Sequence, residues 1–390
     1  MSERITWIDG LKGLACIGVF LHHFLLGFYP GVFEGTGAAS HTAGNLEYWF
    51  GSSPFSALVC GEYMVCIFCL LSGLVISYQM QRMNDQGKVS DFLIKRYPKL
   101  ALPLFGVSII VWIMLKFHLF TNTGIALLTK STWLGDYYQS TQTFSDVIVC
   151  SFLLVWFVMD NRFSNAFWML KTLFIGSVIS ALLGQMAWKK NKKMYFVYGI
   201  AAGIAFWFDN MYLLFVMGTI LSFTMIKNQE IKRGTWYKVA GWILLVLGLY
   251  LGGYPTRTAP EGIYALIGRI FADRQAALTV HMFAAFFTVS GVYCLDILQK
   301  LLDTKFCRFM GKICYSFFLV HIPVLFSFST WIFGLMLNGT NQYLLSATVA
   351  LITGFLLTVG VSFVFNRYVE QNCYRAVNWL SSKLSIKFFS

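Results

Sequence analysis

Charged residues are scarce in this sequence. They make up 12% of the 390 residues, against roughly 25% in an average soluble domain, while 57% of the chain is hydrophobic. A water-soluble core cannot absorb this excess of apolar residues. The composition therefore excludes an ordinary soluble domain and predicts a multi-pass protein of the cell membrane.

Acidic residues are scarcer than basic ones. The 30 Lys and Arg residues outnumber the 17 acids and give a net charge of +13. The cations occur in short clusters between apolar runs, as expected for loops that flank spanning helices, and not as one basic face. We therefore predict membrane lipid as a partner and no nucleic acid.

Cysteine is uncommon, and its number is odd. Nine are present, an odd count, and six of them lie inside apolar stretches, where a thiol behaves as a small hydrophobe. The first ten residues also lack a small-residue cleavage site, and the first apolar run continues to about Tyr29. We predict a membrane anchor at this end, and no disulfide framework.

The apolar runs set the fold class. A spanning helix needs about 20 largely apolar residues. The chain offers ten candidates: Leu11–Tyr29, Leu58–Tyr78, Leu100–Leu119, Ala166–Trp188, Met194–Phe208, Met211–Ile226, Val239–Tyr254, Ala276–Leu295, Ile313–Leu337 and Tyr343–Phe365. We predict an all-α polytopic bundle of about ten spanning helices, forming one domain over residues 1–390 without a fused soluble domain. Val147–Val158 is apolar but short, and is predicted to be a re-entrant or interfacial helix.

The distribution of cations predicts the orientation. Of the 30 Lys and Arg residues, 23 fall in alternate connections that include both ends of the chain, and five fall in the connections opposite. Cytoplasmic loops hold the excess of positive charge. Both termini are therefore predicted to be cytoplasmic.

Ionisable residues inside the first predicted span are candidates for function, because burying them in a bilayer is costly. Lys12 lies at the cytoplasmic entrance, and His22 and His23 lie deep inside. On an ideal helix Lys12 and His23 are only ~20° from facing alike, with a rise of ~16 Å between them, whereas His22 points ~80° away. This spacing suits a long anionic carrier, such as a coenzyme A thioester, whose reactive end reaches His23. A neutral imidazole is a suitable general base near pH 7; the alternative is a packing histidine.

Other ionisable residues lie in later spans. His321, in the ninth, falls at a depth similar to that of His23 and could orient it or share a proton with it, or be structural. His281 falls near an outer end, where an interfacial histidine costs little. Glu62 and Lys171 also fall toward outer ends, where they either snorkel to the interface or contact an acceptor.

Four motifs spread over nearly the whole chain resemble those of the membrane-bound acyltransferase 3 family, the integral membrane O-acyltransferases of surface polysaccharides. The opening IDGLKGLACIGVFLHHF is similar to the family's start, in which a basic residue precedes a histidine by eleven positions. The segments FCLLSGLVISY, FLIKRYPKLALP and GKICYSFFLVH resemble three further family elements. The matching positions are Lys12 and His23, then Phe68, Ser72 and Gly73, then Arg96, Lys99 and Pro103, then Gly311, Tyr315 and His321.

Several positions depart from the family pattern. Lysine replaces arginine at Lys12 and Lys99, which keeps the charge but loses the planar fork that binds phosphate in a bidentate way. Leu173 occupies the position of a family glutamate. In the ninth span, Cys314 and Phe318 replace serine and tyrosine.

The resemblance implies an O-acyltransferase, in the first instance an O-acetyltransferase, with acetyl-CoA or another acyl-CoA as donor. It implies His23 as the catalytic residue, and His321 is predicted to join it. Lys12, Ser72, Arg96 and Lys99 are predicted to bind the donor, and no metal is predicted. The predicted acceptor is a hydroxyl of an extracytoplasmic glycan or lipid-linked glycan, and a separate extracytoplasmic partner could assist.

One alternative function fits the same loops. A transporter or flippase of lipid-linked sugars would also use basic cytoplasmic loops and an aromatic-rich outer surface, although repeated halves with broken helices are not evident. The first outer loop offers side chains suited to sugar contacts: Glu34, His41, Glu47, Tyr48 and Trp49. The sequence leaves open whether transfer is direct or passes through an acyl-histidine, and whether the group is acetyl or succinyl.

Overall fold

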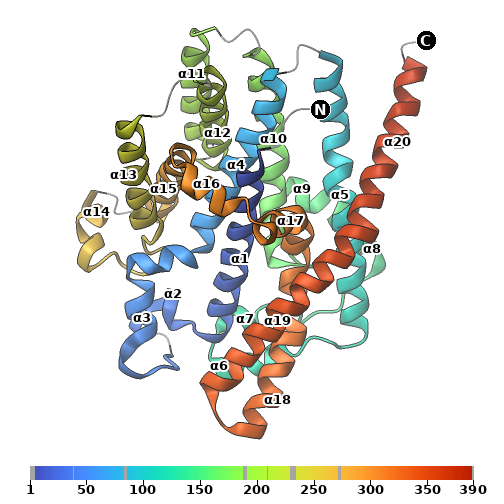
Figure 1. Ribbon diagram of the computed structural model, residues 1–390. Helices are drawn as coiled ribbons and strands as arrows, with labels where there is room; N and C mark the ends of the chain where they lie inside the picture. Colours follow the sequence, from blue (N-terminus) through green and yellow to red (C-terminus); the bar gives the residue numbers. More distant parts are fainter. Residues whose placement is uncertain are drawn as a thin grey trace. The chain divides into compact units, whose positions relative to one another are not determined.

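Helices form the whole of the regular structure in the described part of the chain. The computed structural model describes residues 5–37, 39–82, 86–187, 191–208, 210–228, 234–270 and 274–388. Within these ranges every regular element is helical (Figure 1). The predicted all-α class is confirmed. Five of the cations counted for the orientation lie outside the described residues: Arg4, Lys189, Lys190, Lys232 and Arg233.

Among the described residues, eight helical segments are long and apolar enough to cross a membrane. They are Thr6–Phe28, Gly61–Arg82, Val89–Lys116, Asn165–Met186, Thr235–Gly252, Ala276–Cys294, Lys305–Thr340 and Tyr343–Lys383. The fifth and sixth predicted spans form the shorter apolar helices Met194–Phe208 and Met211–Lys227. The chain is therefore a multi-pass membrane protein, while the total of ten spans and the cytoplasmic position of both termini stay predictions.

The long helices carry the labels of Figure 1. They are α1 (Thr6–Phe28), α4 (Gly61–Arg82), α5 (Gln86–Lys116), α10 (Trp168–Met186), α11 (Met194–Phe208), α12 (Asn210–Lys227), α13 (Thr235–Gly252), α15 (Arg274–Cys294), α17 (Lys305–Val324), α18 (Thr330–Thr340), α19 (Tyr343–Phe365) and α20 (Gln371–Phe388). Shorter helices join them: α2 (Gly31–Glu34), α3 (Leu46–Gly51), α6 (Asn122–Thr129), α7 (Thr132–Gly135), α8 (Phe144–Val149), α9 (Val155–Phe157), α14 (Ala265–Ile270) and α16 (Asp296–Leu302).

The basic segment before the third span is helical, not a loop. The apolar run begins at Leu100, so the sequence placed the start of the span there, but α5 is one helix of 31 residues from Gln86. Pro98 and Pro103 lie inside it. Proline removes a backbone donor, and a helix tolerates this where neighbouring groups satisfy the freed carbonyl. Between the two prolines, the Tyr315 hydroxyl of α17 donates to the Leu100 carbonyl at 2.7 Å and ties α5 to that helix.

In the part of the chain that the structure describes, three π-helical turns interrupt the helical segments. Cys150–Leu154 lies between α8 and α9, in the segment predicted to be re-entrant or interfacial, and its depth in the membrane stays a prediction. Leu325–Ser329 joins α17 to α18, and Asn366–Glu370 joins α19 to α20. Such turns occur often at functional sites.

The chain folds into two compact units, each made of three segments. Unit 1 comprises Met1–Val19, Trp49–Leu93 and Thr172–Lys312, and unit 2 comprises Phe20–Tyr48, Ile94–Lys171 and Ile313–Ser390. The sequence contained no linker or composition change that marks this division. The predicted single domain over the whole chain stays a prediction.

Unit 1 is held by close helix packing and buried hydroxyl groups. A Cβ added at Gly73 on α4 would lie 2.6 Å from the Phe215 carbonyl oxygen on α12, so only glycine permits this approach. The Ser77 hydroxyl lies 2.6 Å from that of Thr219 and donates to the Ser180 carbonyl. Small residues and shared hydroxyls are what hold helices together in lipid. The family-like Ser72–Gly73 pair thus has a packing role in α4.

Unit 2 has an aromatic core around the second part of α1. The Phe20 ring meets the Phe317 ring of α17 and the Phe355 ring of α19, at centroid distances of 6.0 and 5.5 Å. Both pairs have the edge-to-face geometry that aromatic rings prefer. These contacts fix α1 against α17, which determines where their histidines lie.

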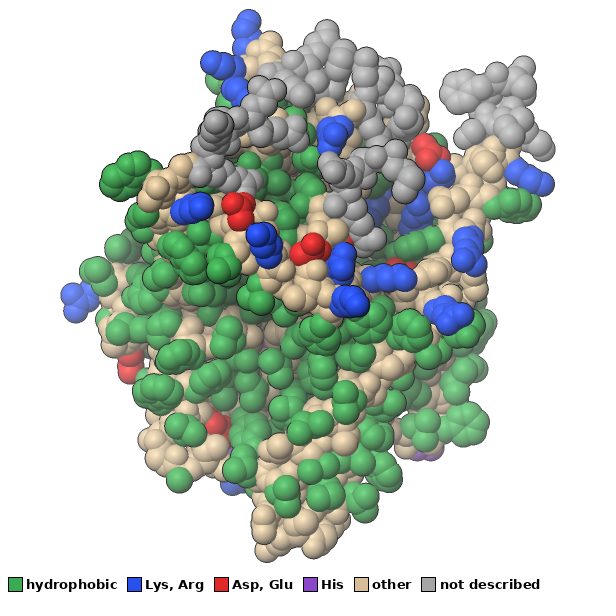
Figure 2. All heavy atoms as spheres, in the orientation of Figure 1, with side chains coloured by type: hydrophobic (Ala, Val, Ile, Leu, Met, Phe, Trp, Pro, Cys, Tyr) green, Lys and Arg blue, Asp and Glu red, His purple; other side chains and the backbone are tan. Residues whose placement is uncertain are grey.

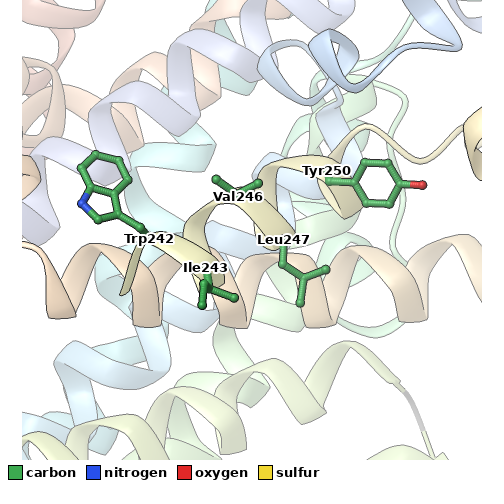
Figure 3. A pocket seen from close by; sticks show the side chains of 5 residues that line it. All are labelled: Trp242, Ile243, Val246, Leu247 and Tyr250. Carbon is green, nitrogen blue, oxygen red and sulfur yellow. The ribbon is translucent and has the colours of Figure 1, made fainter. Parts of the chain in front are cut away.

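The outer flanks of the helices are apolar. Figure 2 shows broad areas of hydrophobic side chains, and on α13 of unit 1 Trp236, Ile243 and Val246 are all more than 60% exposed. Such surfaces suit contact with lipid chains. A hollow on this flank is lined by Trp242, Ile243, Val246, Leu247 and Tyr250, all from α13 (Figure 3). Its lining contains no acidic, basic or histidine side chain, so we interpret it as lipid-facing surface and not as a reaction site.

Candidate active site

Two histidines from distant parts of the sequence meet in unit 2. His23 lies on α1 and His321 on α17, and His321 Nε2 is 3.1 Å from His23 Nδ1. The His321 side chain is fully buried, whereas His23 is partly buried. The structure thus brings together the two residues predicted to be catalytic, although they are 298 positions apart.

The neighbours of His321 determine how this pair holds its protons. His321 Nδ1 lies 2.8 Å from the Phe318 carbonyl oxygen and 3.2 Å from that of Phe317. Carbonyls only accept, so Nδ1 carries the proton, and a neutral His321 accepts at Nε2. The buried environment favours this neutral form, because ionisation in an apolar interior is costly. His23 then donates through Nδ1–H and has its lone pair on Nε2. The departure from the family at Phe318 leaves this arrangement intact, because the backbone supplies the carbonyl.

His22 has different neighbours from His23. Its ring packs against Phe33 with a centroid distance of 4.4 Å, and it meets the His23 ring edge-on at 5.3 Å. The His23 ring instead stacks on Trp133 and lies beside His321. The two adjacent histidines therefore occupy distinct environments, as the helical spacing predicted.

Trp133 covers one face of His23 and was not identified from the sequence. The two rings are stacked, with centroids 5.4 Å apart and an interplanar angle of 17°. Trp133 lies on α7, whose N-cap residue Ser131 accepts from the Leu134 backbone N–H and donates to the Leu26 carbonyl of α1 at 2.8 Å. The serine of the segment STWLG is a typical N-cap residue for a short helix. Nothing in that segment indicated contact with α1.

The two cations of α5 lie beside tyrosines from other helices of unit 2. Lys99 Nζ is 5.8 Å from the centre of the Tyr374 ring of α20. Arg96 interacts electrostatically with Tyr374 and with Tyr315 of α17. Both cations are partly buried. Arg96 and Lys99 thus share one neighbour, as expected for residues that present adjacent charges on a helix.

A buried glutamate belongs to the same cluster and was missed in the sequence. Glu370, in the π-helical turn before α20, is only 5% exposed and interacts with both tyrosines of this cluster. Its Oε2 accepts from the Ser316 hydroxyl at 2.5 Å and from Asn366 Nδ2 at 2.9 Å. The isolated acid in FVFNRYVEQN, just after the last apolar run, was the available signal.

Replacing both Arg96 and Lys99 by glutamine is expected to weaken use of acyl-CoA while leaving the fold intact. Charge-assisted hydrogen bonds to phosphate are stronger than neutral ones, so losing two cations should raise the KM for acetyl-CoA by about tenfold or more. Calorimetry with acetyl-CoA and initial rates measure the effect. The matched control is Arg375→Gln with Lys383→Gln on α20, which removes the same charge. Equal binding by both double variants would leave Arg96 and Lys99 only a topological role.

The other two predicted donor-binding residues belong to unit 1. Lys12 lies on α1, which is continuous from Thr6 to Phe28, so the ~16 Å rise from Lys12 to His23 holds along the helix. The Ser72 hydroxyl donates to the Phe68 carbonyl of its own helix at 2.7 Å, and Ser72 is buried. Roles of Lys12 and Ser72 in donor binding stay predictions.

The first outer loop uses part of its polar set for its own structure. Glu47 is 4% exposed and accepts from the backbone N–H groups of Gly31 and His41. The His41 ring stacks on Tyr343 with centroids 4.0 Å apart, and its Nε2 lies 2.8 Å from the Thr129 carbonyl oxygen. Glu47 and His41 therefore organise this loop. Trp49, at 57% exposed, remains accessible for stacking on a sugar.

The predicted interfacial position of His281 stays a prediction, but the side chain has partners that the sequence did not reveal. The side chain is fully buried in unit 1, with Nδ1 2.9 Å from Glu62 Oε1 and Nε2 3.0 Å from the Tyr254 carbonyl oxygen. Glu62 thus has a partner inside the protein, and does not simply snorkel. Lys171, by contrast, is a cap: its Nζ donates to the Phe157 carbonyl at 3.0 Å. The pairing of His281 with Glu62 joins positions 219 apart, which no local pattern reveals.

Comparisons with known proteins place this site in context. The family model described as "Acyltransferase domain", for the acyltransferase 3 group, matches residues 5–367. The chain is also similar to the O-acetyltransferase PaAT-1 of Phomopsis amygdali, with 20% identity over an alignment covering 98% of this chain and 86% of that protein. No solved structure matches the chain.

Proposed function

Because the chain belongs to the acyltransferase 3 family, we propose that it is a membrane O-acyltransferase, in the first instance an O-acetyltransferase. The donor is cytoplasmic acyl-CoA, and the acceptor is a hydroxyl of an extracytoplasmic glycan or related cell-surface molecule. The similarity to an O-acetyltransferase supports the choice of acetyl. His23 is the catalytic residue of this proposal, and His321 positions it.

The observation that carries the proposal is the contact of 3.1 Å between His321 Nε2 and His23 Nδ1. Two backbone carbonyls fix the proton of His321, and His321 fixes that of His23, so the basic Nε2 of His23 is set by hydrogen bonds through the pair. A base held in one tautomer by a second group is the arrangement that activates hydroxyl nucleophiles in acyl transfer.

The proposed reaction moves one proton and one acyl group. His23 Nε2 takes the proton of the acceptor hydroxyl as the oxygen bonds to the thioester carbonyl carbon. The resulting oxyanion collapses, the carbon–sulfur bond breaks, and the protonated His23 returns its proton to the coenzyme A thiolate. The products are the O-acylated acceptor and free thiol, and His23 ends in its starting state.

The polarity of α1 supports a donor that enters from the cytoplasm. Lys12 and His23 share a face of α1 with a rise of ~16 Å, so the phosphates of a coenzyme A thioester at Lys12 would leave the acyl end near His23. The cluster of Arg96 and Lys99 supplies further positive charge for the carrier. Phosphate recognition by lysine is by charge alone, so the Lys12 and Lys99 departures spread this role over several cations.

The direct test uses purified protein and acetyl-CoA labelled in the acetyl group. Thiol release is measured with and without a panel of hydroxylated acceptor glycans, and label is sought in the glycan. The proposal predicts release that increases with acceptor and label that appears in product. Binding of lipid-linked sugar without thiol release or acetylated product would instead favour the transporter interpretation.

A further inference from the structure

The indole N–H of Trp133 is a buried hydrogen-bond donor that meets no acceptor among the described residues. Trp133 is 7% exposed, and its Nε1 has no hydrogen-bond partner in the described part of the chain. Other tryptophans of unit 2 satisfy this group: Trp156 Nε1 donates to the Ser151 carbonyl at 2.7 Å, and Trp112 Nε1 donates to that of Gln142 at 3.1 Å. Leaving a buried donor unpaired costs about 1–3 kcal/mol, and such a group in a native protein calls for an explanation.

This unpaired donor belongs to the side chain that stacks on the candidate base. The Trp133 and His23 rings are 17° from parallel with centroids 5.4 Å apart. The N–H of an indole and the lone pair of an imidazole each lie in the plane of their own ring. The Trp133 N–H and the His23 lone pair therefore lie in two stacked, nearly parallel planes. Phe326 meets Trp133 edge-on at 4.9 Å and is fully buried, and the Tyr137 ring lies 6.4 Å from the Trp133 ring.

Hydrogen bonds fix the backbone on both sides of Trp133. Ser131 ties the start of α7 to the Leu26 carbonyl of α1, three residues after His23. Asn122 Nδ2 donates to the carbonyls of Leu134 and Tyr137 at 2.7 and 2.9 Å, which fixes the chain on the other side of Trp133. A donor that is fixed before reaction stabilises developing charge without reorganisation.

We propose that the Trp133 Nε1–H donates a hydrogen bond to the acyl carbonyl oxygen of the donor and to the oxyanion that forms from it. This assignment rests on the proposed acyltransferase function, and makes Trp133 a second catalytic residue beside His23. As the acceptor oxygen bonds to the carbonyl carbon, the π electrons of the carbonyl move to its oxygen, and the indole N–H neutralises part of that charge. When the carbon–sulfur bond breaks, the carbonyl re-forms and the negative charge leaves on the thiolate sulfur. That sulfur then receives the proton from His23.

The structure offers a substitution that removes this donor with little other change. Trp133→Phe keeps an aromatic ring to stack on His23 and deletes the N–H. Loss of one oxyanion donor typically lowers kcat by about 10²–10³-fold. We expect that loss in kcat, with the KM for acetyl-CoA and the pH dependence of kcat unchanged. The matched control is Trp156→Phe in the same unit, whose N–H donates to the Ser151 carbonyl and whose loss should leave kcat nearly unaffected.

A second substitution and a spectroscopic readout separate catalysis from folding. Genetic replacement of Trp133 by benzothienylalanine exchanges N–H for sulfur in a side chain of nearly the same shape, and the same loss in kcat is expected. In a His23→Ala background, bound acetyl-CoA labelled with carbon-13 at the carbonyl should show a lowered carbonyl stretch in the infrared. Adding Trp133→Phe should return that stretch toward its value in solution.

The possible outcomes distinguish this assignment from the function on which it rests. Wild-type protein that releases no thiol and acylates no acceptor would overturn the acyltransferase proposal itself. An active wild type, with a benzothienylalanine variant that keeps more than half of its kcat and an unchanged carbonyl stretch, would overturn the role of Trp133 alone.

Discussion

His23→Ala is expected to lower acyl transfer by about 10²–10⁴-fold, the usual cost of losing a general base. The reason is the position of His23 at the end of a hydrogen-bonded pair that leaves the basic lone pair on Nε2. Initial rates of thiol release and of acceptor labelling with purified protein measure the effect. Binding of acetyl-CoA should persist, because the cations proposed to bind its phosphates remain.

The adjacent histidine provides the control for that substitution. His22→Ala removes a ring that packs on Phe33 and leaves the contact between His23 and His321 in place, so transfer should remain within a few-fold of wild type. Equal losses in His22→Ala and His23→Ala, with both variants folded, would contradict the assignment of the base.

His321→Phe is expected to lower kcat on the order of 10⁴-fold, as when the group that holds a catalytic histidine in its correct tautomer is lost. Phenylalanine fills a similar volume in the buried site but offers no acceptor to His23 Nδ1–H. His23 could then place its proton on Nε2 and lose its basic lone pair there. The KM for acetyl-CoA should change little, which separates this effect from general loss of structure.

A glutamine at the same position tests the mechanism of that loss. His321→Gln retains an oxygen acceptor for His23 and an amide donor for the carbonyls of Phe317 and Phe318. It should recover at least tenfold over His321→Phe. Identical rates in the two variants, at equal thermal stability, would show that His321 acts through packing alone.

Much of the fold could be predicted because lipid solvation imposes a strong pattern. The predicted spans Met194–Phe208 and Tyr343–Phe365 coincide with α11 and α19. The limits of α5 could not be found, because hydropathy locates the apolar part of a helix and not its cytoplasmic extension. The cations at positions 95–99 lower the hydropathy of this segment. For that reason the sequence did not reveal the first part of α5, about four helical turns from Gln86 to Lys99, although the helix is continuous there.

In the candidate site, too, relations within one helix could be predicted from the sequence, whereas contacts between separate segments could not. Helical periodicity separated His23 from His22 and related it to Lys12, because these residues share one helix. Contacts between His23, His321 and Trp133 depend on how three separate segments pack, which no periodicity within one segment encodes. Trp133 also lies in a short helix between spans, where the hydropathy pattern gives no information on depth or neighbours.

The central feature of the proposed function is that the acyl group crosses the membrane from a donor on one face to an acceptor on the other. It is tested most directly in sealed vesicles of known orientation, with acetyl-CoA confined to the face that bears the Lys12 end of α1 and an impermeant acceptor glycan on the other face. We expect acetylated glycan from wild type and none from His23→Ala, with coenzyme A staying on the donor side. Product that forms only when both substrates share the Lys12 side would contradict acyl transfer across the membrane.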